Sequence, residues 1–539
     1  MNSTRFPERL HTHFKVRQAH RQTDRHVRRL TTSVAEHCPQ PSQAPVLFFN
    51  ASTRLTGLSL NAGFSLISAW SLRLQGIPVV SFVCQRGMTQ CVLGTHRHDP
   101  SQSPPCQGCI NQSEAIYSGS RQVSFTFQPD PDLDNALSAL GLDELMDFRY
   151  EGVPLGELVL PSVRWILRRH HLQDNPTTLR ILRQYLRSAW SIKGQFQALL
   201  EQVQPSAVVV FNGMQYPEAT ARWIARQKSL KVYSHEVGLR PMSAFFTEGD
   251  ATAYPLEIPS DFQLNEAQNA RLDAYLQARF KGNFIMAGVK FWPEISQLDQ
   301  DFLALAGRFK QVVPVFTNVI FDTSQPHANV LFQDMFIWLD EVLNVARNHP
   351  ETLFVIRAHP DEARKGKASE ESVAEWASKN QVKSLPNIKF IPPEQFISSY
   401  DLIRMSKFVM IYNSTIGMEA SIMGAVVLSA GKSRFTQSDL VYFPADRTAY
   451  LQQLEEFLNA GTLEAPARFS ANARRFLYYQ LYRSSLSFED YLEEDQVWPG
   501  YVRLKDFDWQ ALLPENSPVL KTIFDGIAGR GNFLLTKEV

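Results

Sequence analysis

Three short apolar runs in the second half of the chain each lead into a cluster of polar residues. The runs occupy 312–316, 353–356 and 408–412, and the clusters begin at Thr317, Arg357 and Asn413. Short β-branched and aromatic runs separated by longer helical patterns predict a parallel sheet with crossover helices. Such sheets bind ligands at the carboxyl ends of their strands. The sequence therefore predicts that the three clusters lie on one edge of one sheet.

The third cluster has residue types that suit a phosphate group. Ser414 and Thr415 are good helix N-caps, and a helix that begins there directs backbone N–H groups and its positive dipole end towards a ligand. Gly417 would let the ligand approach the backbone, and Glu419 would accept hydrogen bonds from a ribose diol. His359, at the end of the neighbouring strand, would contact the same phosphates. The alternative is that these residues only cap a helix and end a strand, but their combination favours a nucleotide site.

The candidate donor-binding residues are Thr317, Asn318, Arg357, His359, Pro360, Asn413, Ser414, Thr415, Gly417 and Glu419. The sequences Arg-Ala-His-Pro at 357–360, Asn-Ser-Thr-Ile-Gly-Met-Glu-Ala at 413–420 and Met-Gly-Ala-Val-Val at 423–427 resemble those of bacterial capsule polysaccharide biosynthesis proteins. Those proteins are glycosyltransferases of the GT-B type, with two Rossmann-like domains, and several use CMP-activated sugars. The resemblance extends over 313–431 and implies a nucleotide-sugar donor. UDP-sugar 2-epimerases share the fold and a similar Gly-Glu helix start, so they are the competing class.

Two strands are also predicted in the first half of the chain, at 207–211 and 231–233. The second leads into Ser-His-Glu-Val-Gly at 234–238. A His-Glu pair at the end of a parallel strand lies where a cleft between two domains is expected. Glu236 is the first candidate for the base that deprotonates an acceptor hydroxyl, and His235 is the second. The alternative is a surface loop with two ordinary polar residues.

The composition limits the class of protein. A chain of 539 residues is too long for one core and predicts two domains, and 44% hydrophobic residues suffice for large cores. Lys and Arg number 54, as do Asp and Glu, so the charge gives no argument for a nucleic-acid partner. No apolar run has the length of a membrane span, and the N-terminus lacks the apolar segment of a signal peptide. We therefore expect a cytoplasmic protein that binds no nucleic acid.

Residues 1–40 form a separate basic segment. Seven Arg and one Lys stand between Arg5 and Arg29, against only Glu8 and Asp24. Such a segment is typical of a solvated, partly disordered arm. The alternative is attraction to anionic lipid head groups, which would bring the protein to the inner face of the membrane, near a lipid-linked acceptor.

Three cysteines suggest a second kind of site. Cys91, Cys106 and Cys109 lie close together in the sequence, and the last two form a Cys-x-x-Cys pair. Three thiolates with an imidazole from His96 or His98 would satisfy a tetrahedral structural zinc, and a cytoplasmic setting argues against a disulfide. Because the spacing is irregular and a second Cys-x-x-Cys is missing, free or redox-active thiols are the other interpretation.

The Asp-x-Asp motif at 130–132 lies in a Pro-rich connection, where we expect a loop. Metal-dependent GT-A transferases hold their ion with such a motif at a strand end. Here, helix N-termini would neutralise the departing phosphate instead. We therefore expect transfer without a metal and without any other cofactor.

The predicted fold class is α/β, with two Rossmann-like domains facing across a cleft (GT-B) and with helical insertions. The predicted segments are a basic arm at 1–40, an acceptor domain at 41–260, a linker and helix at 261–310, a donor domain at 311–465 and C-terminal helices crossing back at 466–539. The predicted function is sugar transfer from a nucleotide-sugar donor to a surface polysaccharide or glycolipid. The alternatives are a nucleotide-sugar 2-epimerase and an inactive sugar-binding module.

Overall fold

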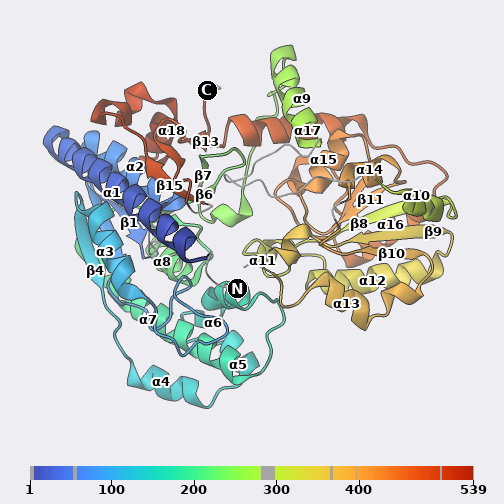
Figure 1. Ribbon diagram of the computed structural model, residues 1–539, viewed down its shortest axis with the longest axis horizontal. Coiled ribbons are helices and arrows are strands. Elements are labelled where there is room, and N and C mark those ends of the chain that lie inside the picture. Colours follow the sequence, from blue (N-terminus) through green and yellow to red (C-terminus); the bar gives the residue numbers. More distant parts are fainter. Residues whose placement is uncertain are drawn as a thin grey trace.

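The computed structural model describes residues 5–51, 57–280, 298–364, 368–395, 397–497 and 500–537. These residues form two α/β halves, each built around its own mainly parallel sheet (Figure 1). Separate hydrophobic clusters cover the two faces of each sheet, so both sheets are sandwiched between packed layers. The predicted fold class of two Rossmann-like domains is confirmed.

The first sheet has seven strands in the order β13-β7-β6-β5-β1-β3-β4. The strands are β1 (Val46–Asn50), β3 (Val79–Cys84), β4 (Arg121–Phe125), β5 (Ala207–Phe211), β6 (Lys231–Val237), β7 (Ser243–Glu248) and β13 (Leu486–Ser487). The pairs β6·β7 and β7·β13 are antiparallel, and the other pairs are parallel. Central parallel strands are buried on both faces, which explains the continuous apolar runs in the sequence.

The helices of the first half connect and cover these strands. They are α2 (Leu60–Leu74), α3 (Cys106–Tyr117), α4 (Pro131–Ser138), α5 (Leu142–Met146), α6 (Leu155–Leu167), α7 (Pro176–Val203) and α8 (Tyr216–Gln227). Helix α7 begins where Asn175 accepts a hydrogen bond from the backbone N–H of Thr178, a standard N-cap. The apolar face of α7 then packs against α6 and α8 and covers one face of the sheet.

The second sheet has five parallel strands in the order β10-β9-β8-β11-β12. They are β8 (Gln311–Phe316), β9 (Thr352–Arg357), β10 (Ile388–Ile391), β11 (Val409–Ile411) and β12 (Val427–Ser429). The helices around them are α9 (Glu266–Phe280), α10 (Gln300–Ala306), α11 (Gln325–Ala328), α12 (Met335–Asn348), α13 (Val373–Lys379), α14 (Ser399–Arg404), α15 (Ile416–Ile422), α16 (Arg447–Asn459) and α17 (Ala467–Tyr482). Their apolar faces fill the two cores of this half.

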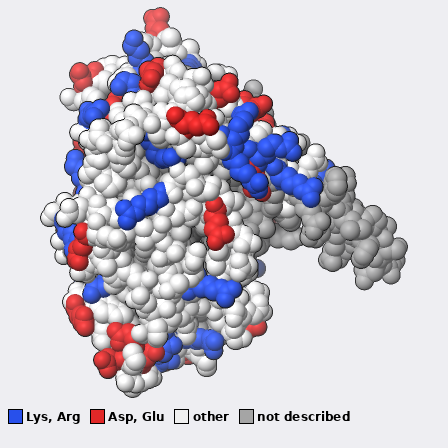
Figure 2. All heavy atoms as spheres, turned by 90° about the vertical axis from the view of Figure 1, so that its left-hand side faces the viewer, with Lys and Arg blue, Asp and Glu red and all other residues white. Residues whose placement is uncertain are grey.

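The basic N-terminal segment is a helix, α1 (Arg5–His37), rather than a partly disordered arm. Val27, Leu30 and Val34 lie at helical spacing and are at most 1% exposed in the core beside α2. The apolar stripe explains the difference, because it ties the second part of α1 to the first half. Exposed arginines lie on the opposite face. Figure 2, which views the side of the molecule where α1 lies, shows one dense group of Lys and Arg and otherwise mixed charges.

The C-terminal segment returns from the second half to the first. After α17, the chain adds β13 to the edge of the first sheet. Strands β14 (Leu492–Glu494) and β15 (Tyr501–Leu504) then form a small sheet with β2 (Leu58–Ser59), and α18 (Pro518–Ile527) packs on α2. Strands as well as helices therefore make this connection. In the described ranges, no helix is both long and apolar enough to cross a membrane.

Candidate functional site

The carboxyl ends of β8, β9 and β11 meet around a cavity of about 130 Å³, which we call the strand-end cavity. Seven of the predicted donor-binding residues line it: Thr317, Arg357, His359, Pro360, Ser414, Thr415 and Glu419. The three strands are neighbours in the sheet, so their parallel arrangement brings together residues that are far apart in the sequence.

The positively charged side chain of Arg357 forms part of the wall of this cavity. Its Nη2 donates a hydrogen bond to the carbonyl oxygen of Ile397 (3.2 Å), and its Nε is buried without a hydrogen-bond partner. Burial lowers the pKa of Arg357 to about 10, which still leaves the guanidinium charged at neutral pH. A buried guanidinium with unused donors favours an anionic ligand such as a phosphate.

His359 lies beside Arg357 in the loop after β9. Its Nδ1 accepts a hydrogen bond from the backbone N–H of Asp361 (3.2 Å), so the proton of the neutral ring is on Nε2. Burial lowers the pKa of His359, which favours this neutral form. The backbone N–H of His359 donates to Oγ1 of Thr317 (3.2 Å). The loops after β8 and β9 are thus joined at the cavity.

Ser414 and Thr415 reach the cavity from the loop between β11 and α15. Helix α15 begins at Ile416, and Thr415 at its cap position makes no side-chain capping bond. The interpretation that these residues only cap the helix is therefore not supported for Thr415. Both side chains belong to the cavity wall.

Three other predicted donor-binding residues do not line the cavity. A Cβ on Gly417 would lie 2.3 Å from Cδ1 of Ile411, so this glycine allows α15 to pack on β11. The expectation that Gly417 admits a ligand is wrong, because the space beside it holds a side chain. Asn318 and Asn413 each have a buried Oδ1 without a hydrogen-bond partner.

Glu419 is held in a buried network that the sequence did not reveal. Its Oε1 accepts hydrogen bonds from Nε and Nη2 of Arg279 (2.8 and 2.6 Å), and its Oε2 accepts one from the hydroxyl of Tyr400 (2.5 Å). Arg279 and Tyr400 also line the strand-end cavity. Arg279 stands 140 positions before Glu419, at the end of α9, so no local pattern pointed to the pair. This network fixes α9, α14 and α15 around the cavity.

A second cavity, of about 510 Å³, lies between the halves, and we call it the inter-sheet cleft. The first half contributes polar side chains that include Asn50, Asn61, Asn212 and Glu236. The second half contributes Asp322, Thr323 and Arg364. Asp322 follows β8 and Arg364 follows β9, so the loops that line the strand-end cavity also line the inter-sheet cleft.

Glu236 presents its carboxylate to this cleft from the end of β6. Nδ2 of Asn212 donates to Oε2 (2.8 Å), and the backbone N–H of Val237 donates to Oε1 (2.8 Å). Asn212 has a left-handed backbone (φ 61°) at the end of β5, a conformation that Asn tolerates. Burial raises the pKa of Glu236, and these hydrogen bonds lower it by a smaller amount. A carboxylate with a raised pKa is suited to accept a proton.

His235 does not act on Glu236, although the two residues are adjacent. Successive side chains of a strand point to opposite faces of the sheet. The ring of His235 is 2% exposed and packs near Phe64 and Phe246, and its Nδ1 has no hydrogen-bond partner. Burial lowers the pKa of His235 to about 3, so the ring is neutral and weakly basic. His235, the second candidate base, also lines the inter-sheet cleft, but its lowered pKa makes it poorly suited to accept a proton.

His171 links the two halves through carboxylates that the sequence did not single out. In the loop between α6 and α7, its Nδ1 lies 2.6 Å from Oε1 of Glu371, and its Nε2 lies 3.2 Å from Oδ2 of Asp334. These hydrogen bonds raise the pKa of His171 to about 10. Among the described residues, His170, His171 and Asp334 form the group whose ligand atoms lie within 4.8 Å of one another, as a metal would require.

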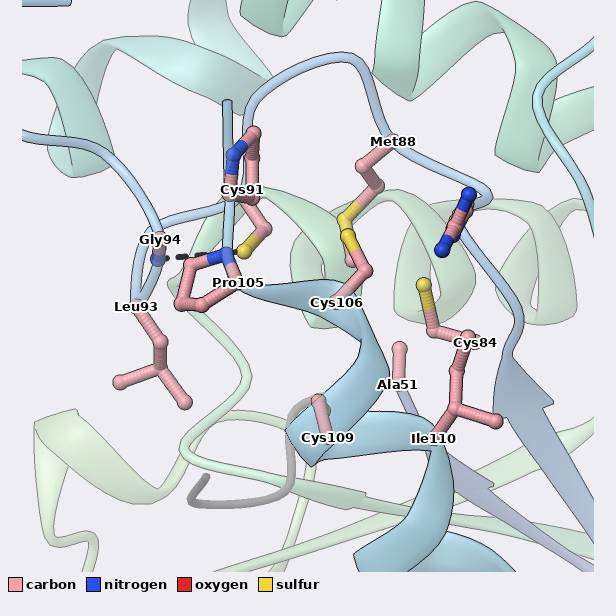
Figure 3. Close-up of a pocket in the computed structure, with 12 residues that line it drawn as sticks. Ala51, Cys84, Met88, Cys91, Leu93, Gly94, Pro105, Cys106, Cys109 and Ile110 are labelled. Carbon is pink, nitrogen blue, oxygen red and sulfur yellow. Dashed lines mark hydrogen bonds between the residues drawn. The ribbon is translucent and has the colours of Figure 1, made fainter. Parts of the chain in front are cut away.

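The predicted zinc ligands Cys91, Cys106 and Cys109 line one small cavity in the first half, together with Cys84 (Figure 3). All five cysteines are described, and no disulfide joins them. His96 and His98 do not line this cavity, so neither is placed as the fourth ligand. No three of these sulfurs lie within 4.8 Å of one another.

The Asp-x-Asp motif begins a helix instead of forming a loop. Oδ1 of Asp130 accepts the backbone N–H groups of Asp132 and Leu133 (both 3.0 Å), which caps α4. Its Oδ2 accepts a hydrogen bond from Nε1 of Trp190 (2.7 Å). Both oxygens of Asp130 therefore have structural partners.

Comparison with known proteins gives distant likenesses. No family model matches the sequence. A segment of 109 residues is 33% identical to Protein FixF from Sinorhizobium fredii and spans 20% of this chain and 23% of that protein.

Solved structures of low similarity include two Kdo transferases and a UDP-GlcNAc 2-epimerase. A beta Kdo 2,4 transferase, Thermosulfurimonas dismutans KpsC, gives a TM-score of 0.34 at 14% identity and covers 50% of this chain and 79% of that one. A beta Kdo 2,7 transferase, also Thermosulfurimonas dismutans KpsC, gives a TM-score of 0.33 at 14% identity over 63% of this chain and 90% of that one. The UDP-GlcNAc 2-epimerase of Neisseria meningitidis gives a TM-score of 0.22 at 13% identity and covers 81% of this chain and 99% of that one. Likenesses this distant do not identify a substrate.

Proposed function

We propose that this protein is a nucleotide-sugar-dependent glycosyltransferase of surface carbohydrate synthesis. The observation that carries the proposal is that the loops after β8 and β9 line both cavities. Thr317 and His359 face the strand-end cavity, whereas Asp322 and Arg364 face the inter-sheet cleft. A donor in the first cavity and an acceptor in the second would meet at these loops.

The strand-end cavity would hold the phosphates of the donor. Arg357 supplies a buried guanidinium with unused donors, His359 supplies Nε2–H, and Ser414 and Thr415 supply hydroxyls. Fixed donors of this kind stabilise the charge that develops on a departing phosphate. We propose that they do so without a metal ion.

Glu236 would act as the base in the inter-sheet cleft. As the acceptor oxygen bonds to the anomeric carbon, its proton would pass to Glu236 and the bond from sugar to phosphate would break. The nucleotide would leave with the electron pair of that bond, held by Arg357. The acceptor is proposed to be a saccharide or a lipid-linked saccharide.

The proposal is tested by measuring nucleotide release from a panel of nucleotide sugars, with and without acceptor oligosaccharides or glycolipids and in the presence of chelator. A transferase releases the nucleotide far faster when a suitable acceptor is present. A nucleotide-sugar 2-epimerase instead converts the donor without any acceptor, and that result would overturn the proposal. Loss of turnover with chelator would overturn its metal-independent form.

A further inference from the structure

Asparagine side chains that line the inter-sheet cleft differ in which of their polar atoms are already used. Asn212 uses both ends of its amide. Its Nδ2 donates to Glu236, and its Oδ1 accepts the backbone N–H groups of Met214 (3.0 Å) and Gln215 (3.2 Å). Asn212 therefore positions Glu236 and keeps no acceptor for a ligand.

Asn61 also donates to Glu236, but its oxygen is unused. Asn61 is the second residue of α2, and its side-chain amide donates a hydrogen bond to the Glu236 carboxylate. Its Oδ1 is buried, and none of the described residues donates to it. A buried oxygen without a donor costs free energy, so such an atom in the wall of a cleft points to a ligand that supplies the hydrogen bond.

Asn50, at the end of β1, offers the opposite half of an amide. Oγ of Ser65 donates to its Oδ1 (3.1 Å), whereas no residue in the described ranges accepts a hydrogen bond from its Nδ2. Ser65 stands four residues after Asn61 on α2, on the same face of the helix. Ser65 thus joins Asn50 to the face of α2 that carries Asn61, and all three residues line the cleft.

A sugar hydroxyl suits this pair of amides, because it donates one hydrogen bond and accepts others. A hydroxyl that donates to Oδ1 of Asn61 and accepts from Nδ2 of Asn50 satisfies both. Glu236, which is bonded to Asn61, can then accept a hydrogen bond from a second hydroxyl beside the first. The cleft, at about 510 Å³, has room for a saccharide.

The charges of the cleft favour an uncharged sugar. Glu218, Glu236 and Asp322 line it, and Arg364 is the one Lys or Arg among its described lining residues. A sugar that carries a carboxylate would meet like charges, which costs affinity.

We propose that the acceptor is an uncharged saccharide whose reacting hydroxyl has a free hydroxyl on the adjacent carbon. The reacting hydroxyl donates to Glu236, and the adjacent hydroxyl donates to Asn61 and accepts from Asn50. This inference rests on the proposed sugar transfer with Glu236 as the base, and it adds two residues that select the acceptor.

Three variants separate binding of the acceptor from positioning of the base. Asn61→Ala and Asn50→Ala should each raise the acceptor KM about three- to tenfold, the effect of one neutral hydrogen bond. The matched variant Asn212→Ala should change the pH dependence of kcat but not the acceptor KM, because its Oδ1 is held by the backbone. An unchanged acceptor KM in both Asn61→Ala and Asn50→Ala would show that these amides contact only solvent, and would overturn the proposal.

The acceptors for this test are the p-nitrophenyl glycosides of glucose, galactose and mannose, each with its monodeoxy analogues. Removing the hydroxyl next to the reacting one should raise the KM of wild-type protein about three- to tenfold. The same removal should have a smaller effect in Asn61→Ala, where that contact is already lost. The wild-type comparison needs no variant to fold, and equal KM values for parent and deoxy glycosides would overturn the proposal.

Saturation-transfer NMR with the same glycosides distinguishes failure of this inference from failure of the proposed function. If wild-type protein transfers sugar but binds the deoxy analogues as tightly as their parents, the transfer stands and the contact with the adjacent hydroxyl is wrong. If no glycoside binds while another acceptor receives sugar, the transfer again stands and the acceptor class is wrong. Glycosides that bind but receive no sugar from any donor would overturn the proposed function, and with it the role of Asn50 and Asn61 in selecting an acceptor.

Discussion

Glu236 and Arg357 are the two residues on which the proposed chemistry depends. Each is partly buried, and each lacks an ion-pair partner among the described residues. A buried charge without a counter-charge costs stability, so such groups concentrate where a ligand or a reaction uses them. They stand in different halves of the molecule, which allows base function and donor binding to be separated by mutation.

Replacing Glu236 by Gln should lower turnover by about 10²- to 10⁴-fold, the usual contribution of a general base. Donor affinity should stay unchanged, because the strand-end cavity lies in the other half. Steady-state rates and donor titration measure the two effects. Glu248→Gln, an exposed substitution on β7, is the control. Wild-type turnover of Glu236→Gln would rule out this base.

The pH dependence of turnover should also report on Glu236. Burial raises its pKa, and the base must be ionised, so turnover should rise with pH through a midpoint above the ordinary Glu value of about 4.3. Asn212→Ala removes a hydrogen bond that lowers this pKa, so it should shift the midpoint upwards. A pH-rate profile for each variant measures the shift. An unchanged midpoint would contradict the assignment.

At the scale of elements, the sequence predicted what depends on strand topology and missed what depends on packing. Apolar runs located the central strands, and parallel order alone placed Arg357 and His359 with Ser414 at one edge. Arg279 reaches this site from α9, a helix that is far away in the sequence. Gly417 had a packing role that only the neighbouring Ile411 reveals.

Helix α1 shows a second limit of the sequence. Its apolar positions Val27, Leu30 and Val34 are few among many charged residues, so overall composition predicted disorder. Their helical spacing was the signal that would have identified a packed helix. Composition alone therefore gave a wrong expectation for an amphipathic segment.

The network of Arg279, Tyr400 and Glu419 should stabilise the second half. Arg279→Met leaves the Glu419 carboxylate buried without its cation, which typically costs about 3–5 kcal/mol. The side chains of Arg279 and Glu419 are 11% and 3% exposed. Urea unfolding measures the loss. The matched control Arg404→Met, which breaks an exposed pair with Asp401, should change the unfolding free energy by less than about 1 kcal/mol. Equal effects would contradict the role of the network.

The contribution of the His171 contacts to the stability of the protein should depend on pH. Its pKa is raised to about 10, so its contribution to stability is complete below the unfolded value of about 6.5 and is lost as pH rises towards 10. Burial alone would raise the pKa values of Asp334 and Glu371, but hydrogen bonds with His171 lower them. The contributions of the Asp334 and Glu371 carboxylates to stability are therefore lost as the pH falls through these lowered pKa values.

Melting temperatures of wild type and His171→Ala, compared from pH 5 to 10, measure this link. The difference should be largest near pH 6 and should shrink as the pH approaches 10. A difference that does not vary with pH would show that His171 contributes only by packing.

At the scale of the whole molecule, we propose that exposed arginines on α1 attract anionic lipids. Arg21, Arg25 and Arg28 are exposed, whereas Arg29 pairs with Asp506 at 2.6 Å. Each juxtamembrane basic residue contributes about 1 kcal/mol of attraction to anionic lipid. Replacing all three by Gln should weaken binding to anionic vesicles by about 10²-fold, measured by co-sedimentation. Neutral vesicles are the control, and equal binding to both would contradict the proposal.

The two halves are joined by more than one segment. The chain passes from the first sheet to the second, and its C-terminal segment returns to add β13 to the first sheet. The contacts of His171 with Asp334 and Glu371 add a further link between the halves. These links hold Glu236 and the strand-end cavity in the same assembly, as transfer between two bound substrates requires.

The central claim is that the strand-end cavity binds a nucleotide through Arg357. Calorimetric titration of CMP, CDP, UDP, GDP and dTDP into wild-type protein, Arg357→Gln and the exposed control Arg404→Gln tests it most directly. One class of nucleotide should bind wild type and the control alike. Loss of a charged hydrogen bond, about 1.5–3 kcal/mol, should weaken its binding to Arg357→Gln by at least about tenfold. Failure of all five nucleotides to bind folded wild-type protein, or equal binding by Arg357→Gln, would contradict the claim.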